Sequence, residues 1–465
     1  MSTFVQRAPM PASAQDVYDW HARPGAFLRL QPPWERYEML PQHGTFGSEG
    51  MRVAFRTHCL GPFKKTWMVE VFDYEPGRGF KYRQVEGPFA EWVHTFRFIP
   101  DGERSSFLEN EIAYRVPLGM AGRAIWGRMV QRRLKAMFAY RRAVTASDLR
   151  RYGQFRDRPR MKIAVTGSRG LVGSELVPFL TTGGHSVVRL VTGRVPDSPS
   201  HDGTRYVAWN PQAPLDPGTL DGCDAVIHLA GDNIGDGRWN DTKRKRILES
   251  RTIPTRHIAD AIAALPPERR PKAFLCASGI SLSGTRGDEE RGDESNAGTG
   301  FLADVCRGWE EATKPASEAG VRVVNMRIGI VLSPKDGALG KQLFAFKAGA
   351  GAVLGSGKQW LPWIIINDLI GAIHHCLMTD SLHGPVNMCS PHPVTNRVFT
   401  KTLGRVLSRP AFMWLPRFAL KVMFGDMADE ALLASTRAVP TKLLDSGFAF
   451  DHVELEGALR FLLGR

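Results

Sequence analysis

Alternating hydrophobic and polar positions run through the first 150 residues and predict a strand-rich domain. Two short helices are expected at 12–20, where Ser13 fits an N-cap and Asp16 the capping-box position, and at 24–30. A longer helix is predicted at 121–146 from an apolar stripe of helical period. This order predicts an α+β domain whose curved antiparallel sheet grips the long helix around an apolar cavity. Strand-like runs with a period of two occupy residues 4–7, 36–40, 51–59, 66–74, 80–85, 92–99 and 106–116.

The pattern changes at residue 161. Residues 162–166 form a short, fully apolar run, and strand-like and helix-like segments then alternate to about residue 395. Such alternation is typical of βαβ units, and therefore of an α/β Rossmann-type, doubly wound parallel sheet. The rest of the chain is mainly helical and ends in a helix at 455–463. We therefore expect a cavity domain at 1–150, a basic linker at 151–160, a nucleotide-binding domain at 161–400 and a small helical domain at 401–465.

Composition narrows the class of protein. The chain has 465 residues, of which 43% are hydrophobic and 23% charged, as in ordinary globular proteins. Its six cysteines lie far apart, with no zinc-ligand spacing, so we expect no metal site and a reducing compartment. No apolar run reaches the roughly 18–20 residues of a membrane span, and the N-terminus does not resemble a signal peptide. We expect a cytoplasmic protein without a membrane span.

The positive charge is concentrated in one place. The chain carries a formal net charge of +14, and residues 121–160 hold twelve Arg and Lys against two Asp. This window would suit an anionic membrane or a nucleic acid, or it is a solvated helix face that continues into a linker. We favour the second interpretation and expect no nucleic-acid partner, because no aromatic interleaving accompanies the charge.

A glycine-rich loop directly follows the apolar run at 162–166. Glycines at every third position let the pyrophosphate of a dinucleotide approach the backbone at the N-terminus of the next helix, where free N–H groups meet its charge. The strand–loop–helix context makes this motif specific. We assign the whole loop to cofactor binding: Gly167, Ser168, Arg169, Gly170, Leu171, Val172 and Gly173.

The second strand of this domain, at 186–191, indicates which cofactor is bound. NAD-binding folds place an acid at its end to hold the ribose 2′-hydroxyl. Here no acid precedes Asp197, whereas Arg169 and Arg194 are basic. We therefore predict NADP, with NAD less favoured, unless Arg194 simply faces solvent.

The next strand, within 224–231, ends in small residues that leave room for a cofactor ribose. We assign Leu229, Ala230 and Gly231 to the cofactor site. His228 lies inside this apolar run, so we interpret it as a core histidine rather than a base.

A set of motifs runs along the second part of the chain: Gly167-x-x-Gly170-x-x-Gly173, residues 228–231, Arg238-Trp239, Ser250-Arg251, Trp309-Glu310, residues 327–332, residues 357–364, Asn387-Met388, residues 391–394 and the tail at 440–448. Together they resemble the extended short-chain dehydrogenase/reductase superfamily, in its atypical NAD-dependent epimerase-like branch. The resemblance covers about 161–463 and implies that Arg327 and Ile328 also contact the cofactor.

The opening at 12–20, 24–27 and 32–34 resembles the START-like, or SRPBCC, helix-grip family, whose members bind hydrophobic ligands.

The catalytic pair expected from this resemblance is missing. Extended short-chain dehydrogenases use Tyr-x-x-x-Lys for proton transfer, but Phe301 and Val305 stand at the matching positions. Ser278 survives at the end of its strand, and Asp232 follows a cofactor-side strand. We regard these two as candidate catalytic residues, with substrate or water as other proton sources.

Substrate contacts can be named only as candidates. A basic set of Arg238, Lys243 and Arg251 would suit a phosphate or carboxylate, but it would also suit a helix surface. Trp239, Trp360 and Trp363 would suit an apolar wall, although each would also suit the core.

Two functions fit these observations. The first is an NADP(H)-dependent oxidoreductase or epimerase-like enzyme for an unknown small molecule of apolar character, delivered or held by residues 1–150. Fusion would keep that ligand at high effective concentration near the cofactor. The alternative is a catalytically silent NADP-binding sensor coupled to the hydrophobic-ligand-binding domain.

Overall fold

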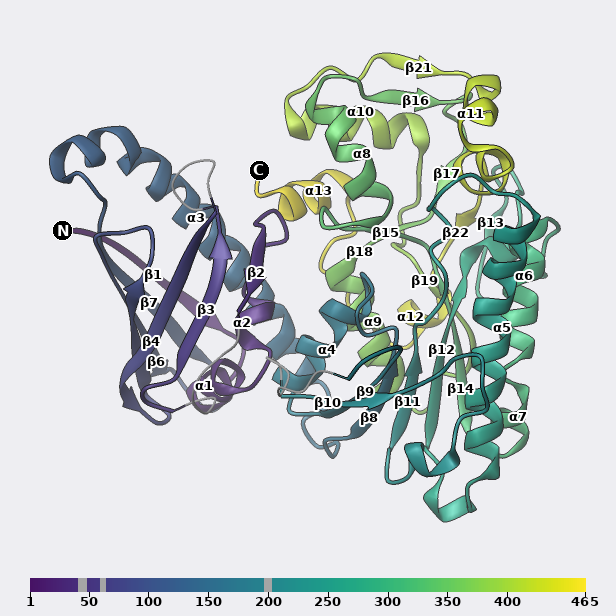
Figure 1. Cartoon of the computed structure of the whole chain (residues 1–465), viewed down its shortest axis with the longest axis horizontal. Coiled ribbons are helices and arrows are strands. Elements are labelled where there is room, and N and C mark those ends of the chain that lie inside the picture. The colour runs from purple at the N-terminus through teal and green to yellow at the C-terminus, as the bar shows by residue number, and fades with distance from the viewer. Residues whose placement is uncertain (41–47, 59–63, 196–202) are drawn as a thin grey trace.

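The computed structural model describes residues 1–40, 48–58, 64–195 and 203–465, which build two sheet-centred parts (Figure 1). The first part contains an antiparallel sheet in the order β1-β7-β6-β5-β4-β3-β2. All seven predicted strands are present with shifted ends, except that residue 59 lies outside the described residues. Their bounds are β1 (Ser2–Met10), β2 (Tyr37–Met39), β3 (Arg52–Thr57), β4 (Lys65–Glu75), β5 (Gly79–Glu86), β6 (Glu91–Pro100) and β7 (Ser106–Arg115).

Three helices complete the first part. They are α1 (Ala14–Ala22), α2 (Ala26–Arg29) and α3 (Gly119–Gly153). The predicted cap of α1 is confirmed, because the Ser13 side chain accepts a hydrogen bond from the Asp16 N–H. The helix therefore begins at residue 14 rather than 12. Helix α3 packs against β6 and β7, and its residues Val130, Leu134 and Phe138 are buried.

Helix α3 is longer than the pattern predicts. It continues through Gly153, three residues into the segment expected as a basic linker. Arg151 and Tyr152 are buried within it, because they pack on the second part of the molecule. Ile125, expected in the apolar stripe, is 66% exposed instead.

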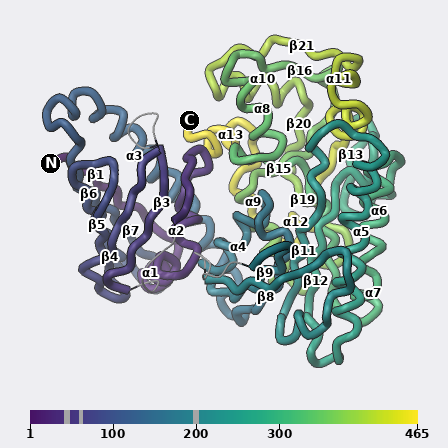
Figure 2. Tube along the Cα trace, in the orientation of Figure 1, coloured from purple at the N-terminus to yellow at the C-terminus, as the bar shows by residue number. Residues whose placement is uncertain are grey.

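The second part is a fully parallel sheet in the order β10-β9-β8-β11-β12-β14-β19, the doubly wound arrangement predicted. Helices α5, α6 and α7 lie together on one face, while α4 and α9 face the first part (Figures 1 and 2). The strands are β8 (Lys162–Thr166), β9 (Ser186–Val191), β10 (Arg205–Ala208), β11 (Ala225–His228), β12 (Ala273–Gly279), β14 (Arg322–Ile328) and β19 (Gly384–Met388); the helices are α4 (Gly173–Thr182), α5 (Asp241–Ala264), α6 (Phe301–Glu311), α7 (Lys314–Glu318) and α9 (Ile366–Met378).

The C-terminal part is mainly helical, as predicted, with short strands joined to earlier ones. Strand β21 (Met413–Leu415) pairs with β16 (Ala352–Leu354), and β22 (Arg437–Ala438) pairs with β13 (Glu290–Arg291). Two further short pairs join β15 (Ile330–Leu332) to β18 (Trp363–Ile365) and β17 (Trp360–Leu361) to β20 (Val394–Thr395). The helices are α8 (Gly337–Lys347), α10 (Asn396–Leu407), α11 (Arg417–Phe424), α12 (Thr441–Asp445) and α13 (Leu455–Leu463).

The two sheet-centred parts share one hydrophobic cluster, which joins α1 and β7 of the first to α4 and α9 of the second. Buried ion pairs reinforce it. Arg29 Nη2 lies 2.8 Å from Asp148 Oδ1, and Arg151 Nη2 lies 2.7 Å from Asp368 Oδ1. Near the C-terminus, the ring of Tyr140 on α3 stacks on Phe461 of α13 at 5.1 Å. Among the described helices, none is both long and apolar enough to cross a membrane.

Candidate functional site

The loop between β8 and α4 has the geometry of a phosphate cradle. Gly167 has a φ of +65°, and a Cβ there would lie 2.6 Å from the carbonyl carbon of Leu229. A Cβ at Gly173 would lie 2.3 Å from the carbonyl oxygen of Gly167. These two glycines are therefore required by the fold itself, one by its backbone conformation and both by close packing.

Gly170 differs from its two neighbours. Its φ is not in the left-handed region, and a Cβ would meet only the Gly167 carbonyl oxygen, at 3.3 Å. Nothing in the described protein demands glycine there, yet a side chain would fill the exposed cradle at the N-terminus of α4. In the same loop the buried Ser168 hydroxyl has no hydrogen-bond partner. A dinucleotide pyrophosphate needs the space that Gly170 leaves open, and it can accept a hydrogen bond from a hydroxyl such as that of Ser168.

The glycine-rich loop lies next to the end of β9, and both segments carry an arginine. Arg169 is exposed and its Nη1 lies 3.4 Å from the carbonyl oxygen of Thr192, two residues before Arg194. No Asp or Glu occupies residues 186–195. The sequence interpretation missed Arg189, which is buried in β9 and donates to Thr204 Oγ1 at 2.8 Å. Burial lowers the pKa of Arg189; Tyr206 opposes the shift, and the positive charge of Arg169 adds a smaller lowering. Because Arg189 lies inside an apolar strand, the sequence did not indicate that it lies near the candidate cofactor site.

Strand β11 leads to the small residues assigned to the cofactor. Leu229 and Ala230 are partly exposed, and their backbone packs closely against Gly167. His228 is fully buried and bonded to Thr166 Oγ1 at 2.6 Å. Burial lowers the pKa of His228 to about 3, so the ring is neutral near pH 7. His228 therefore lies in the core, as interpreted, although its Nε2 has no hydrogen-bond partner among the described residues.

Asp232 lies in a cluster of cations beyond this strand. Its Oδ2 is 2.5 Å from Lys243 Nζ and 3.2 Å from Arg246 Nε. The Lys243 ammonium also donates to the carbonyl oxygen of Asn233, and Arg251 donates to that of Asp232. The structure thus brings Asp232, Lys243 and Arg251 together, but these charged groups already bind one another or the carbonyl oxygens of their own loop.

Ser278 belongs to a second polar cluster, at the end of β12. Its hydroxyl donates to Glu310 Oε1 at 2.8 Å. The same carboxylate receives two bonds from Arg327, at 2.8 and 2.9 Å. Arg327, expected at the cofactor, is therefore held in a buried ion pair, and its neighbour Ile328 packs against the core. Glu310 was not recognised as a site residue, although it stands in a motif quoted for the resemblance.

The substituted catalytic positions are filled by packing. Phe301 meets the indole of Trp239 edge-on at 5.5 Å, and Val305 is buried beside it. Neither side chain can exchange a proton. Trp239 also donates to the Ile234 carbonyl, so it holds its own loop as well as α6.

The remaining substrate candidates have different surroundings. Arg238 is exposed next to Gly425. Trp363 is fully buried and its indole N–H donates to the His392 carbonyl, which places it in the core. Trp360 is half-buried, donates to Asp288 Oδ1 at 2.6 Å and lies under Arg437. In the described ranges, no three His, Cys, Asp or Glu side chains gather as metal ligands would.

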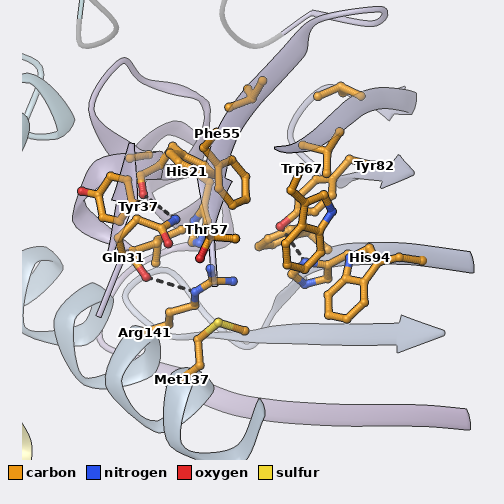
Figure 3. Close-up of a pocket in the computed structure, with 18 of the residues that line it drawn as sticks. His21, Gln31, Tyr37, Phe55, Thr57, Trp67, Tyr82, His94, Met137 and Arg141 are labelled. Carbon is orange, nitrogen blue, oxygen red and sulfur yellow. Dashed lines mark hydrogen bonds between the residues drawn. The ribbon is translucent and has the colours of Figure 1, made fainter. Parts of the chain in front are cut away.

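The first part of the molecule encloses a cavity of about 210 Å³ between its sheet and α3 (Figure 3). Its wall is mostly apolar and aromatic. Figure 3 shows Phe55 and Trp67 on the sheet side, with Met137 and Arg141 reaching in from the helix. The predicted apolar cavity is present, but it also contains charged and hydrogen-bonding groups.

A chain of hydrogen-bonded polar side chains lies along one side of this cavity. His94 Nε2 is 2.9 Å from Asn110 Oδ1, an acceptor, so this nitrogen carries the proton. Burial holds the pKa of His94 well below its usual value, so Nδ1 is unprotonated and accepts from the Tyr82 hydroxyl at 2.6 Å. The phenol oxygen of Tyr82 therefore keeps its lone pairs for other groups. Figure 3 shows this pair at the edge of the cavity.

Comparisons with known proteins match all three segments. Family models match residues 1–142 (polyketide cyclase / dehydrase and lipid transport), 163–389 (NAD dependent epimerase/dehydratase family) and 415–462 (a domain of unknown function). An epimerase family protein of Mycobacterium bovis is 38% identical over 304 residues, covering 65% of this chain and 98% of that protein. The human epimerase family protein SDR39U1 is 33% identical, over 64% of this chain and 99% of its own length.

Two solved structures extend the comparison. The nucleoside-diphosphate sugar epimerase of Corynebacterium glutamicum covers 99% of this chain and 90% of its own, with a TM-score of 0.80 and 30% identity. Its match therefore includes the cavity domain. Human SDR39U1, solved with NADPH, covers 65% of this chain and 99% of its own, with a TM-score of 0.59 and 32% identity.

Proposed function

This chain belongs to the NAD-dependent epimerase/dehydratase family, and from that premise we propose that it is an NADP(H)-dependent oxidoreductase or epimerase-like enzyme. The observation that carries the proposal is Gly170, a position where the fold tolerates a side chain and a pyrophosphate does not. The human relative crystallised with NADPH supports the same cofactor.

The residues around the glycine-rich loop fit three groups of NADP: the pyrophosphate, the 2′-phosphate and the ribose on the nicotinamide side. The backbone N–H groups at the start of α4 and the Ser168 hydroxyl would hold the pyrophosphate. Arg169 and Arg194 would hold the 2′-phosphate, because both are cations and no Asp or Glu occupies residues 186–195. The ribose on the nicotinamide side would lie against Leu229–Gly231. NAD, which lacks the 2′-phosphate, would gain nothing from these cations.

A bound nicotinamide supplies or takes up hydride, so the chain must handle a proton separately. We assign that task to Ser278, whose hydroxyl lies at the end of β12 and bonds to Glu310. A proton taken by Ser278 from a substrate hydroxyl can pass to this carboxylate, which Arg327 holds in place. Asp232 is the weaker candidate, because its carboxylate already forms ion pairs with Lys243 and Arg246.

The substrate is proposed to be an apolar small molecule held or delivered by the first domain. Its cavity is lined mainly by apolar side chains, and the domain is packed firmly against α4. We further propose a cytoplasmic location. The five cysteines in the described ranges are all free and buried: Cys223, Cys276, Cys306, Cys376 and Cys389.

Mass spectrometry of the purified full chain tests the proposal. Small molecules extracted from the protein are identified, and each is incubated with the protein and NADPH deuterated at nicotinamide C4. Transfer of deuterium to a bound compound is the expected result. If NADPH binds but is never oxidised, and its binding changes the affinity for the cavity ligand, the oxidoreductase proposal is overturned in favour of the sensor.

A further inference from the structure

The guanidinium of Arg141 is the feature of the cavity that an apolar ligand alone does not explain. Arg141 extends from α3 into the enclosed space (Figure 3). Its Nε donates to the Leu30 carbonyl at 3.1 Å, and its guanidinium carbon lies 5.2 Å from the centre of the Phe138 ring. No carboxylate in the described residues forms an ion pair with it.

The other charges in the cavity are already paired. Glu35 is the nearest acid, but both its oxygens accept from Arg133, with Nε at 2.8 Å from Oε1. His21 adds no negative charge, and burial lowers its pKa to about 4, so it is neutral near pH 7. The undescribed segments 41–47 and 59–63 contain no Asp or Glu. Arg23, which also lines the cavity, lies 3.7 Å from Asp19, so among the described residues of the lining Arg141 is the arginine without an ion-pair partner.

An unpaired buried charge is costly, and proteins keep one where a partner arrives later. Burial lowers the pKa of Arg141, while Tyr82, through its charge and a hydrogen bond, and to a smaller extent Glu35 oppose the shift. The phenol of Tyr82 cannot neutralise the guanidinium, because burial raises its pKa to about 12. The missing partner must come from the ligand.

We propose that the cavity binds an apolar carboxylic acid, with its carboxylate on the Nη atoms of Arg141 and its apolar body against the wall that includes Phe55 and Trp67. One negative charge matches the one guanidinium that has no ion-pair partner among the described residues of the lining. A phosphate dianion would leave excess negative charge among apolar side chains. This inference rests on the proposed function only in requiring that the cavity holds an apolar ligand.

Isothermal titration calorimetry on the full chain compares three ten-carbon ligands: decanoate, 1-decanol and decylammonium. Decanoate should bind at least about tenfold more tightly than decanol, because a charge-assisted pair replaces a neutral hydrogen bond. Decylammonium should not bind measurably. Equal affinities for decanoate and decanol in the unaltered protein would overturn the proposal without any variant.

The variant Arg141→Gln should remove the preference for decanoate and leave decanol binding unchanged. Arg132→Gln is the matched control, because it removes the same charge from an exposed position on the same helix; it should keep the preference. A preference that survives Arg141→Gln overturns the assignment. If neither ten-carbon ligand binds, the apolar-ligand part of the proposed function falls as well, and parallel NADPH titration shows whether the cofactor part stands.

Discussion

Gly170→Val should separate cofactor binding from fold stability. The backbone of Gly170 suits any residue, and a Cβ there would be 3.3 Å from a single atom, the Gly167 carbonyl oxygen. A shift of a few tenths of an ångström relieves that contact, so the free energy of unfolding should change by less than about 1 kcal/mol. The added side chain would occupy the space in front of α4 that the pyrophosphate needs. We expect NADPH affinity to fall at least about 100-fold, which corresponds to roughly 2.8 kcal/mol.

Gly173→Ala provides the contrast. Its Cβ would lie 2.3 Å from the Gly167 carbonyl oxygen and 2.6 Å from Ser168 Cα, both backbone atoms that cannot move away cheaply. It should therefore cost about 1–3 kcal/mol of stability through overpacking. Calorimetric titration with NADPH and urea denaturation measure the two quantities for each variant. The reasoning is refuted if Gly170→Val binds NADPH like the unaltered protein, or loses as much stability as Gly173→Ala.

Three other changes test separate parts of the structure. Replacing Arg169 and Arg194 together by Ala should lower NADPH affinity at least about tenfold and leave NADH affinity unchanged, measured by fluorescence titration; an unaltered NADPH preference would contradict the assignment. Ser278→Ala should slow turnover of the identified substrate by about tenfold or more at unchanged NADPH affinity, whereas an equal rate would exclude Ser278 from proton transfer. The ordinary pKa of a histidine, 6.5, is lowered to about 3 for His228, so below pH 6.5 the unfolded chain binds a proton there that the folded chain does not. Its contribution to the free energy of unfolding should therefore fall by about 1.4 kcal/mol per pH unit from pH 6.5 towards 3, and His228→Asn should reduce that slope in urea titrations at pH 7, 6 and 5.

Much of the fold could be predicted because its signals are local. The run at 186–191 coincides with β9, and 455–463 coincides with α13. An apolar run of only about six residues between turns favours a strand of a covered sheet, because a helix usually needs about ten residues or more. The glycine loop was found for the same reason, since its spacing and its flanking strand and helix are contiguous in sequence.

The parts that escaped prediction depend on distant partners. Arg151 looked like a linker residue because its partner Asp368 lies 217 positions away along the chain. The sequence indicated no role for Glu310, because only the fold brings it beside Ser278 and Arg327. Arg141 was counted only as one of twelve basic residues in its window, because sequence alone does not say which positive charge faces an enclosed cavity.

Helix α3 is one uninterrupted helix of 35 residues, about 52 Å long, so no loop separates its two halves. One half closes the cavity, while the other half is buried against the nucleotide-binding part through Tyr152 and Arg151. Cutting the chain between the two parts would therefore remove Arg151 from Asp368. That buried carboxylate would keep only the backbone N–H groups of Asp451 and His452 as hydrogen-bond partners, and a buried charge without its cation is strongly destabilising.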